Sequence, residues 1–334
     1  MKRFLLICFL LIGIAQNIVE AQNVTVTLTT DKGFENSAII AKLQDNLSKV
    51  LTEINTAQKE VRPLNIVGLP MNDFASKSLS MLWANVHFYC DDEEVVERCW
   101  PLANGYMIRQ IPLIITPQGE DFGSGTYQEA VIEFNLNGVI TDFRFCSDLH
   151  LGESMESGGN EVLDSEQRMK ILTYCERLRT AYNQKNMEFL RQAFSDDALI
   201  ITGSVIKTKP SEVNLGGAKV VYKKQTKAEY LANLQKAFIR NKWIEVKFSE
   251  IGENGETGGP KAITRSRENP NMYGVRLRQE WKSSTYSDEG YLFLLWDFAD
   301  ENAPVIHVRT WQPEWVGDQK LPEEEIFSLT DFDL

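Results

Sequence analysis

The sequence predicts an α+β protein of two domains, on three observations. Near the carboxyl end, three apolar and aromatic segments follow one another, and two of them alternate apolar with polar residues. Such alternation is typical of β-strands, and a strand that is apolar on both faces must be covered on both. Elsewhere, apolar residues recur at helical spacing. A stretch rich in Gly, Ser and Glu, His150–Gly159, predicts a linker at 151–163 between two units of ordinary domain size.

The first unit, residues 22–150, is predicted to place helices ahead of an antiparallel sheet. Apolar residues recur on one helical face between Ile39 and Ile54. The Asn137-Gly138 pair indicates a hairpin, because both turn positions need positive φ. The predicted elements are a strand over 22–31, helices over Asn36–Thr56 and Asp73–Ala84, an apolar segment at Val86–Tyr89, and strands over Tyr106–Ile115, Tyr127–Leu136 and Val139–Cys146.

The second unit, residues 164–316, is predicted to begin with a helix whose apolar face is Ile171–Tyr182. Thr226 and Glu229 form a capping box ahead of a third helix. The segment Ile206–Val221 is expected to be an excursion over a pocket mouth. The other predicted elements are a short helix over Met187–Phe194 and strands over Ala198–Thr202, Trp243–Ile251, Gly274–Lys282, Tyr291–Phe298 and Val305–Trp311.

The order helix, helix, strand, helix and then a meander of four long strands resembles the nuclear transport factor 2-like (cystatin-like) superfamily. The local similarity is Thr180–Gly203, where an apolar helix ends at Tyr182, a short helix follows, and Ser195–Ile200 enters a strand. The resemblance covers residues 164–316 only. It implies a bent sheet that wraps around its helices into a cone with a pocket inside. Enzymes, ligand binders and interaction modules share this fold, so it does not choose among activities.

The amino terminus, residues 1–21, is typical of a secretion signal. Lys2 and Arg3 precede the apolar run Phe4–Ile14, which is shorter than the roughly 20 residues that span a bilayer. Export would place the mature protein in the periplasm or outside the cell, with no membrane insertion after signal cleavage. The formal charge of −12 argues against a nucleic-acid partner, which calls for a basic surface.

The cysteines and histidines limit the possible chemistry. Cys90 and Cys99 flank a short acidic segment, and in an exported protein they could close a small disulfide loop or stay free. His87, His150 and His307 form no close pair, so no metal site is predicted. No cofactor is predicted either.

Asp297 and His307 are the candidate catalytic pair. They lie on consecutive predicted strands, and a short antiparallel connection would bring them near each other. An imidazole oriented by a carboxylate can act as a general base. The pair would suit an isomerase, dehydratase or hydrolase acting on a small molecule. The competing interpretation is a cross-strand pair near the sheet edge that only satisfies two polar groups.

The same strands supply the candidate ligand-binding residues. Arginines on one sheet face could hold an anionic ligand, or they could form a ladder of cross-strand ion pairs. Aromatic side chains could line a pocket for a ring-bearing ligand, or they could be core or interface. The candidates are Arg276, Arg278, Glu280, Trp281, Tyr291, Arg309 and Trp311.

The preferred hypothesis is an exported, non-catalytic binding or protein-interaction module with a cone-shaped pocket. The sequence shows no nucleophile elbow, phosphate loop, metal cluster or clear acid/base pair. The expected partner is a small molecule or an envelope protein, and the sheet could support a homodimer. The acidic tail, 317–334, either docks into a partner, as in a subunit of an envelope assembly, or is disordered.

Overall fold

The computed structural model of the chain describes residues 23–31, 36–116, 125–147, 165–208, 217–251 and 263–332. The described residues form five α-helices and two large β-sheets, which confirms the α+β class. Each sheet has its own apolar core. The secretion signal and the linker predicted from the sequence lie outside the described residues.

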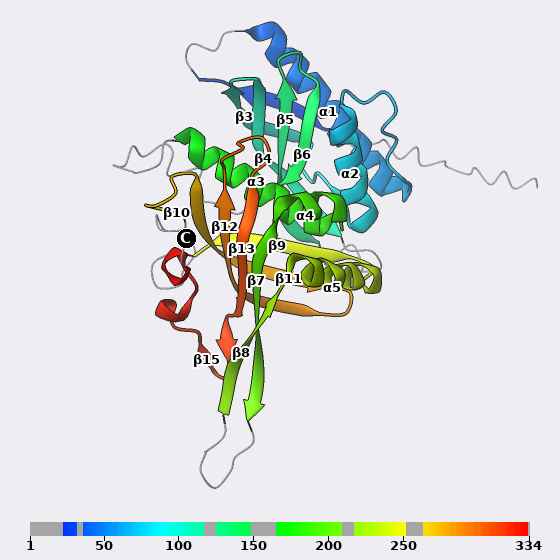
Figure 1. Cartoon of the computed structure of the whole chain (residues 1–334). Coiled ribbons are helices and arrows are strands. Elements are labelled where there is room, and N and C mark those ends of the chain that lie inside the picture. The colour runs from blue at the N-terminus through cyan, green and yellow to red at the C-terminus, as the bar shows by residue number, and fades with distance from the viewer. Residues whose placement is uncertain are drawn as a thin grey trace, which may run out of the picture.

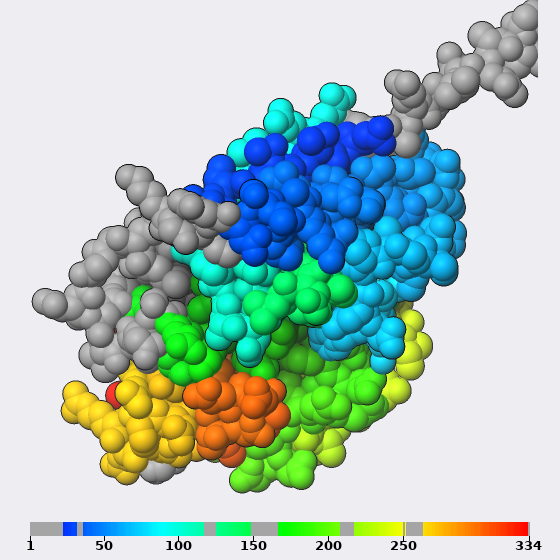
Figure 2. All heavy atoms as spheres, turned by 90° about the horizontal axis from the view of Figure 1, so that it is seen from above, coloured from blue at the N-terminus to red at the C-terminus, as the bar shows by residue number. Residues whose placement is uncertain are grey.

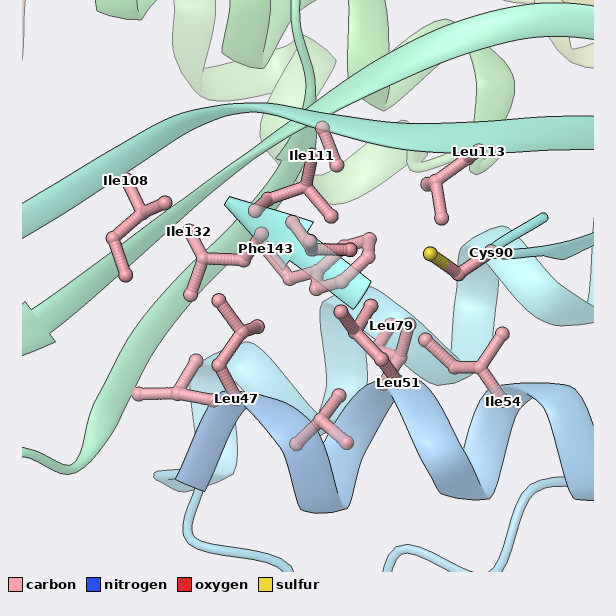
Figure 3. Close-up of a cluster of buried hydrophobic side chains, with 14 of the residues drawn as sticks. Leu47, Leu51, Ile54, Leu79, Cys90, Ile108, Ile111, Leu113, Ile132 and Phe143 are labelled. Carbon is pink, nitrogen blue, oxygen red and sulfur yellow. The ribbon is translucent and has the colours of Figure 1, made fainter. Parts of the chain in front are cut away.

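The first half of the chain folds as two helices over a six-stranded sheet. Its elements are β1 (Thr25–Thr29), α1 (Ser37–Glu60), α2 (Asp73–Asn85), β2 (His87–Tyr89), β3 (Glu94–Leu102), β4 (Gly105–Thr116), β5 (Thr126–Asn135) and β6 (Ile140–Phe145). Asn36 and Asn72 cap the two helices by accepting a hydrogen bond from the N–H three residues on. Leu47, Leu51 and Ile54 of α1 point toward the side chains of the sheet (Figure 3). Only the β1–β3 pair of this sheet is parallel.

Of the two alternatives for Cys90 and Cys99, the structure has the free one, with both cysteines unpaired and buried in this first core. The sequence interpretation missed β3, which begins between the two cysteines and contains Cys99. Both β2 and β3 pair with β4, where Cys99 lies opposite Ile108, while Tyr89, next to Cys90, lies opposite Ile114. This offset is on the order of 15 Å along the strand, whereas a disulfide needs Cα atoms within roughly 7 Å.

The second half places three helices against a seven-stranded sheet. Its elements are α3 (Ser165–Asn183), α4 (Met187–Ala193), β7 (Phe194–Thr208), β8 (Gly217–Gln225), α5 (Lys227–Arg240), β9 (Ile244–Glu250), β10 (Ile263–Arg265), β11 (Met272–Ser283), β12 (Ser287–Asp297), β13 (Val305–Pro313), and the short pair β14 (Trp315–Val316) and β15 (Gln319–Lys320). The strand order is β10-β11-β12-β13-β7-β8, with β9 paired to β11. Every pair except β13–β7 is antiparallel, so the predicted meander is confirmed.

Two local predictions in this half have opposite outcomes. The capping box at Thr226 and Glu229 is present at the start of α5. The excursion expected at Ile206–Val221 is corrected in part, because residues up to Thr208 and from Gly217 onward pair as β7 and β8. Figure 1 shows these strands as an arm that extends beyond the rest of the sheet. Residues 209–216 lie outside the described part of the chain.

Helix α3 lies between the two sheets (Figure 1). Its apolar side chains, such as Ile171 and Leu178, belong to the second core. Its opposite side carries Glu176, which is fully buried against β4 and β6 of the first half. Ion pairs continue from this carboxylate across the junction, through a group that we name the α3 ion cluster: Arg109, Glu133, Asp142, Arg144, Glu176 and Arg177. Seen from above, the blue and cyan first half lies over the second (Figure 2).

The carboxyl-terminal segment packs against the outer face of the second sheet, so the expectation of disorder is wrong for its described part. Phe327 and Phe332 contact a buried cluster of Phe293, Leu295 and Val308. The rings of Phe293 and Phe332 stack with centroids 5.4 Å apart. Apolar side chains therefore hold the segment, while its three consecutive glutamates, residues 323–325, are exposed.

Candidate functional site

The second half has an open pocket between α5 and the inner face of its sheet. The cavity has a volume of about 420 Å³. Side chains from α5, β7, β11, β12 and β13 line it, including Thr202, Ser204, Tyr230, Asn233, Leu234, Gln279, Trp281, Asp288, Arg309 and Trp311. The pocket thus combines large aromatic surfaces with a few polar groups, the usual composition of a small-molecule site.

Strand register brings the polar groups of the pocket together. In an antiparallel pair, residues directly opposite each other project from the same face of the sheet. Asp288 of β12 lies opposite Trp281 of β11. Arg309 and Trp311 of β13 lie opposite Leu294 and Leu292, two residues of the inner core. The six side chains therefore share the face that looks into the cone.

Arg309 is the most unusual group in the pocket, because its charge is buried without an ion pair to any described carboxylate. The residue is only 6% exposed. Its Nη2 reaches Gln279 Oε1 at 3.4 Å, at the long end of hydrogen bonding, and its Nε has no hydrogen-bond partner among the described residues. The guanidinium carbon lies 5.0 Å from the centroid of the Tyr230 ring, which is within cation–π range.

Two tyrosine side chains lie next to Arg309. The hydroxyls of Tyr182, from α3, and Tyr230, from α5, are 2.8 Å apart and hydrogen-bonded. Burial raises the pKa of Tyr230 well above its ordinary value, so this hydroxyl stays neutral at physiological pH. Burial alone would lower the pKa of Arg309, but its interactions with Tyr230, Tyr182 and Asp288 raise it above its ordinary value, so the guanidinium stays charged.

A second pocket, of about 250 Å³, lies where α2, α3 and α4 meet β6, and its charged groups already have partners. Lys77 pairs with Glu188, and Asp142 pairs with Arg144 and Arg177. None of its described lining side chains has a buried polar atom without a hydrogen-bond partner. The chemistry of this second pocket is therefore satisfied within the chain.

The predicted ligand-binding residues divide between the two faces of the second sheet. Trp281, Arg309 and Trp311 line the pocket. The other four predicted residues are on the outer face, because side chains alternate along a strand. Arg278 forms an ion ladder there: its Nη1 is 2.6 Å from Glu280, its Nε is 3.1 Å from Glu314, and it also pairs with Glu289.

The remaining outer-face candidates are also held by neighbours within the chain. Arg276 lies 3.9 Å from Glu323. Tyr291 is buried under the carboxyl-terminal segment beside Leu321 and Ile326. The prediction that Arg276, Arg278, Glu280 and Tyr291 bind the ligand together with the tryptophans is therefore not supported by the geometry.

Sequence reasoning did not select three of the pocket residues, Tyr230, Gln279 and Asp288. Gln279 is two positions from Trp281 on the same strand, so the alternation of side chains could have placed it on the same face. Asp288 was missed because β12 begins at Ser287, four residues before the predicted strand. Tyr230 was assigned only to the inner face of a helix, and the pattern gives no indication that this face borders a cavity.

The candidate catalytic pair does come together, but away from this pocket. His307 Nε2 is 3.5 Å from Asp297 Oδ2, and Nδ1 is 3.6 Å from Asp197 Oδ1. Val308 lies opposite Leu295 and Ile306 opposite the next residue, Trp296, so His307 is the extra residue of a β-bulge. Its side chain is 29% exposed and does not line the pocket, which favours the competing interpretation of a cross-strand polar pair.

Replacing His307 with glutamine should therefore leave ligand binding in the pocket unchanged. We expect the dissociation constant to move by less than about twofold, because no pocket contact is lost. Isothermal titration of the variant and of the wild-type protein with the same ligand, such as the benzoate probe described below, measures the two dissociation constants. A loss of tenfold or more would restore the Asp297–His307 pair as part of the site.

The described residues hold no group of three or more His, Cys, Asp or Glu side chains placed to bind a metal ion. No helix among them has the length and apolar character needed to cross a membrane.

No protein-family model matches the chain, and no curated protein matches it. Among solved structures, Bd1075 of Bdellovibrio bacteriovorus is 12% identical with a TM-score of 0.32; the match covers 46% of this chain and 42% of that one, so the chain spans less than half of it. A protein of unknown function from Shewanella oneidensis MR-1, described as NTF-2 like, is 14% identical with a TM-score of 0.29, and the match covers 43% and 98%. A naphthalene 1,2-dioxygenase is 8% identical with a TM-score of 0.34, and the match covers 53% and 91%. These likenesses are too slight to carry an argument about function.

Proposed function

We propose that the protein binds a small, ring-bearing organic anion in the pocket of its second half and does not catalyse a reaction on it. The observation that carries this proposal is Arg309, a guanidinium buried in the cavity wall without an ion pair to any described carboxylate.

A buried charge that forms no ion pair favours a bound anion. Removing a guanidinium from water costs several kcal/mol, and a neutral amide such as Gln279 recovers only part of it. A carboxylate accepts two hydrogen bonds in the plane of a guanidinium and recovers more. Trp311 Nε1 is a second buried donor without a partner among the described residues, and it lines the same cavity. Both residues line the pocket, and an anion bound there would supply acceptors that the described residues do not.

The pocket walls favour a flat ring on the anion. Trp281 and Trp311 both line the cavity, and aromatic rings prefer stacked or edge-on contacts with other rings. Gly290 of β12 permits the position of Trp311, because a Cβ at Gly290 would come within 2.8 Å of the indole Cζ2 atom. The indole thus lies directly against the backbone of the neighbouring strand.

Two further parts of the proposal concern fold family and location. The second half is proposed to be a nuclear transport factor 2-like cone, which its element order and its meander support. The protein is proposed to act outside the cytoplasm, on the strength of the basic start and short apolar run of its first residues.

Binding can be tested with benzoate and its neutral analogue benzamide, read by the fluorescence of the pocket tryptophans. Wild-type protein should bind benzoate at least tenfold more tightly than benzamide. Replacing Arg309 with methionine should weaken benzoate binding by roughly 30-fold or more, since losing one partner of a buried charge pair costs about 2–5 kcal/mol.

Arg276→Met is the matched control, because Arg276 is on the next-but-one strand of the same sheet and faces outward. It should leave benzoate binding unchanged. Equal affinity for benzoate and benzamide, or equal binding by the Arg309 and Arg276 variants, would refute the anion site.

A further inference from the structure

The pocket also holds a buried acceptor that the binding of a simple anion leaves unused. Asp288 Oδ2 accepts a hydrogen bond from the Tyr286 hydroxyl at 2.8 Å, but Oδ1 is buried with no hydrogen-bond partner among the described residues. We infer that the ligand is an α-amino acid with a ring in its side chain, whose carboxylate lies at Arg309 and whose ammonium group lies at Asp288. This inference rests on the proposed function of the same pocket.

Charge balance favours a ligand with both signs. Arg309 and Asp288 line one cavity, and each influences the ionisation of the other. A ligand that is only anionic would satisfy the guanidinium but would bring a second negative charge toward the carboxylate, in a site where charges are poorly screened. A zwitterion places its ammonium group at Asp288 and its carboxylate at Arg309, so all four charges are paired.

The aromatic surroundings favour an ammonium group over a neutral hydroxyl at the acidic end. Trp281 lies directly opposite Asp288 in the β11–β12 register, so its indole borders the place where the donor would sit. A cation gains from the face of an indole, whereas a hydroxyl gains much less. A charge-assisted hydrogen bond to a carboxylate is also roughly twice as strong as a neutral one.

The test compares four probes that share a phenyl ring: L-phenylalanine, 3-phenylpropanoate, L-phenyllactate and 2-phenylethylamine. Wild-type protein should bind L-phenylalanine at least tenfold more tightly than 3-phenylpropanoate, which lacks the ammonium group, or L-phenyllactate, which has a hydroxyl instead. 2-Phenylethylamine, which lacks the carboxylate, should bind at least tenfold more weakly than L-phenylalanine. Isothermal titration gives all four constants.

Asp288→Asn should remove the preference for L-phenylalanine while leaving 3-phenylpropanoate bound as well as before or better. Glu289→Gln, one residue away on the outer face, should retain the wild-type preference. Circular dichroism of both variants checks that the fold is kept, and Tyr286→Phe, which removes only the hydrogen bond to Oδ2, provides a second and milder change at the same carboxylate. The preference should fall in that variant as well.

The outcomes separate this inference from the anion site itself. Binding of 3-phenylpropanoate that depends on Arg309 but equals or exceeds that of L-phenylalanine would overturn the amino-acid assignment and keep the anion site. Phenyllactate binding as tightly as phenylalanine would also overturn the assignment. Binding of L-phenylalanine or 3-phenylpropanoate that is indifferent to Arg309 would overturn both.

Discussion

Replacing Glu176 with alanine is expected to destabilise the protein by about 3–5 kcal/mol, because it leaves two buried guanidinium groups facing an empty position. The carboxylate is fully buried on α3 and accepts from Arg109 at 2.5 Å and from Arg144 Nε at 3.0 Å. It also accepts the backbone N–H of Ser147 at 3.1 Å. Urea unfolding measures the loss as a drop in the transition midpoint.

Glu166→Ala is the matched control on the same helix. Its carboxylate is 78% exposed and lies 3.4 Å from Lys170, and an exposed pair of this kind contributes little. We expect its unfolding midpoint to match that of the wild-type protein. If the two alanine variants proved equally stable, the α3 ion cluster would not be holding the two halves together.

The acid sensitivity of the protein gives an independent measure of the same carboxylate. Burial alone would raise the pKa of Glu176, but the charges of Arg109 and Arg144 hold it below its ordinary value. A carboxyl group whose folded pKa is depressed contributes stability above its unfolded pKa, and that contribution is lost as pH falls through the folded pKa. Stability of the wild-type protein should therefore fall in acid below about pH 4.5, and Glu176→Gln should show a shallower fall.

The buried side of α3 shows why a sequence pattern can predict an element and miss its environment. The apolar face from Ile171 to Tyr182 predicted the helix correctly. Nothing in that pattern distinguishes the opposite side from an exposed one, since Glu176 and Arg179 are typical surface residues. Their burial follows from the second face of the first sheet, where Asp142 and Arg144 alternate with the core residues Phe143 and Phe145.

The sequence could predict which strand residues face the pocket wherever the simple alternation of side chains between the two sheet faces decides it. Alternation placed Trp281 on one face of β11 and Arg278 on the other, as the structure has them. This alternation is interrupted at a β-bulge. Because His307 is the extra residue of the bulge, it does not share the face of Arg309, although the two are only two positions apart. The mutual placement of Asp288 and Arg309 also depends on the register between β12 and β13, in which Leu292 and Leu294 of β12 lie opposite Trp311 and Arg309. No local sequence pattern contains that register.

Deleting residues 322–334 is expected to cause self-association and to lower stability. The deletion uncovers Phe293, Leu295 and Val308, which are now buried under Phe327 and Phe332. An apolar patch of this kind on a sheet face marks an association site. Light scattering should show dimers or larger species, and the free energy of unfolding should fall by on the order of 3 kcal/mol, typical of removing buried phenyl groups.

The charge of the segment can be separated from its packing. Replacing the exposed residues Glu323, Glu324 and Glu325 with glutamine keeps Phe327 and Phe332 in place and should leave the protein monomeric and as stable as before. The backbone contacts support this: Phe327 N–H donates to Gln312 Oε1 at 2.8 Å, and Gln312 Nε2 donates to the carbonyl of Glu325 at 2.8 Å, so neither depends on a glutamate side chain. If the glutamine variant associated as strongly as the truncated chain, negative charge rather than apolar cover would be what keeps this sheet face from pairing. If the truncated chain stayed monomeric with an unchanged unfolding midpoint, the segment would be an appendage rather than part of the fold.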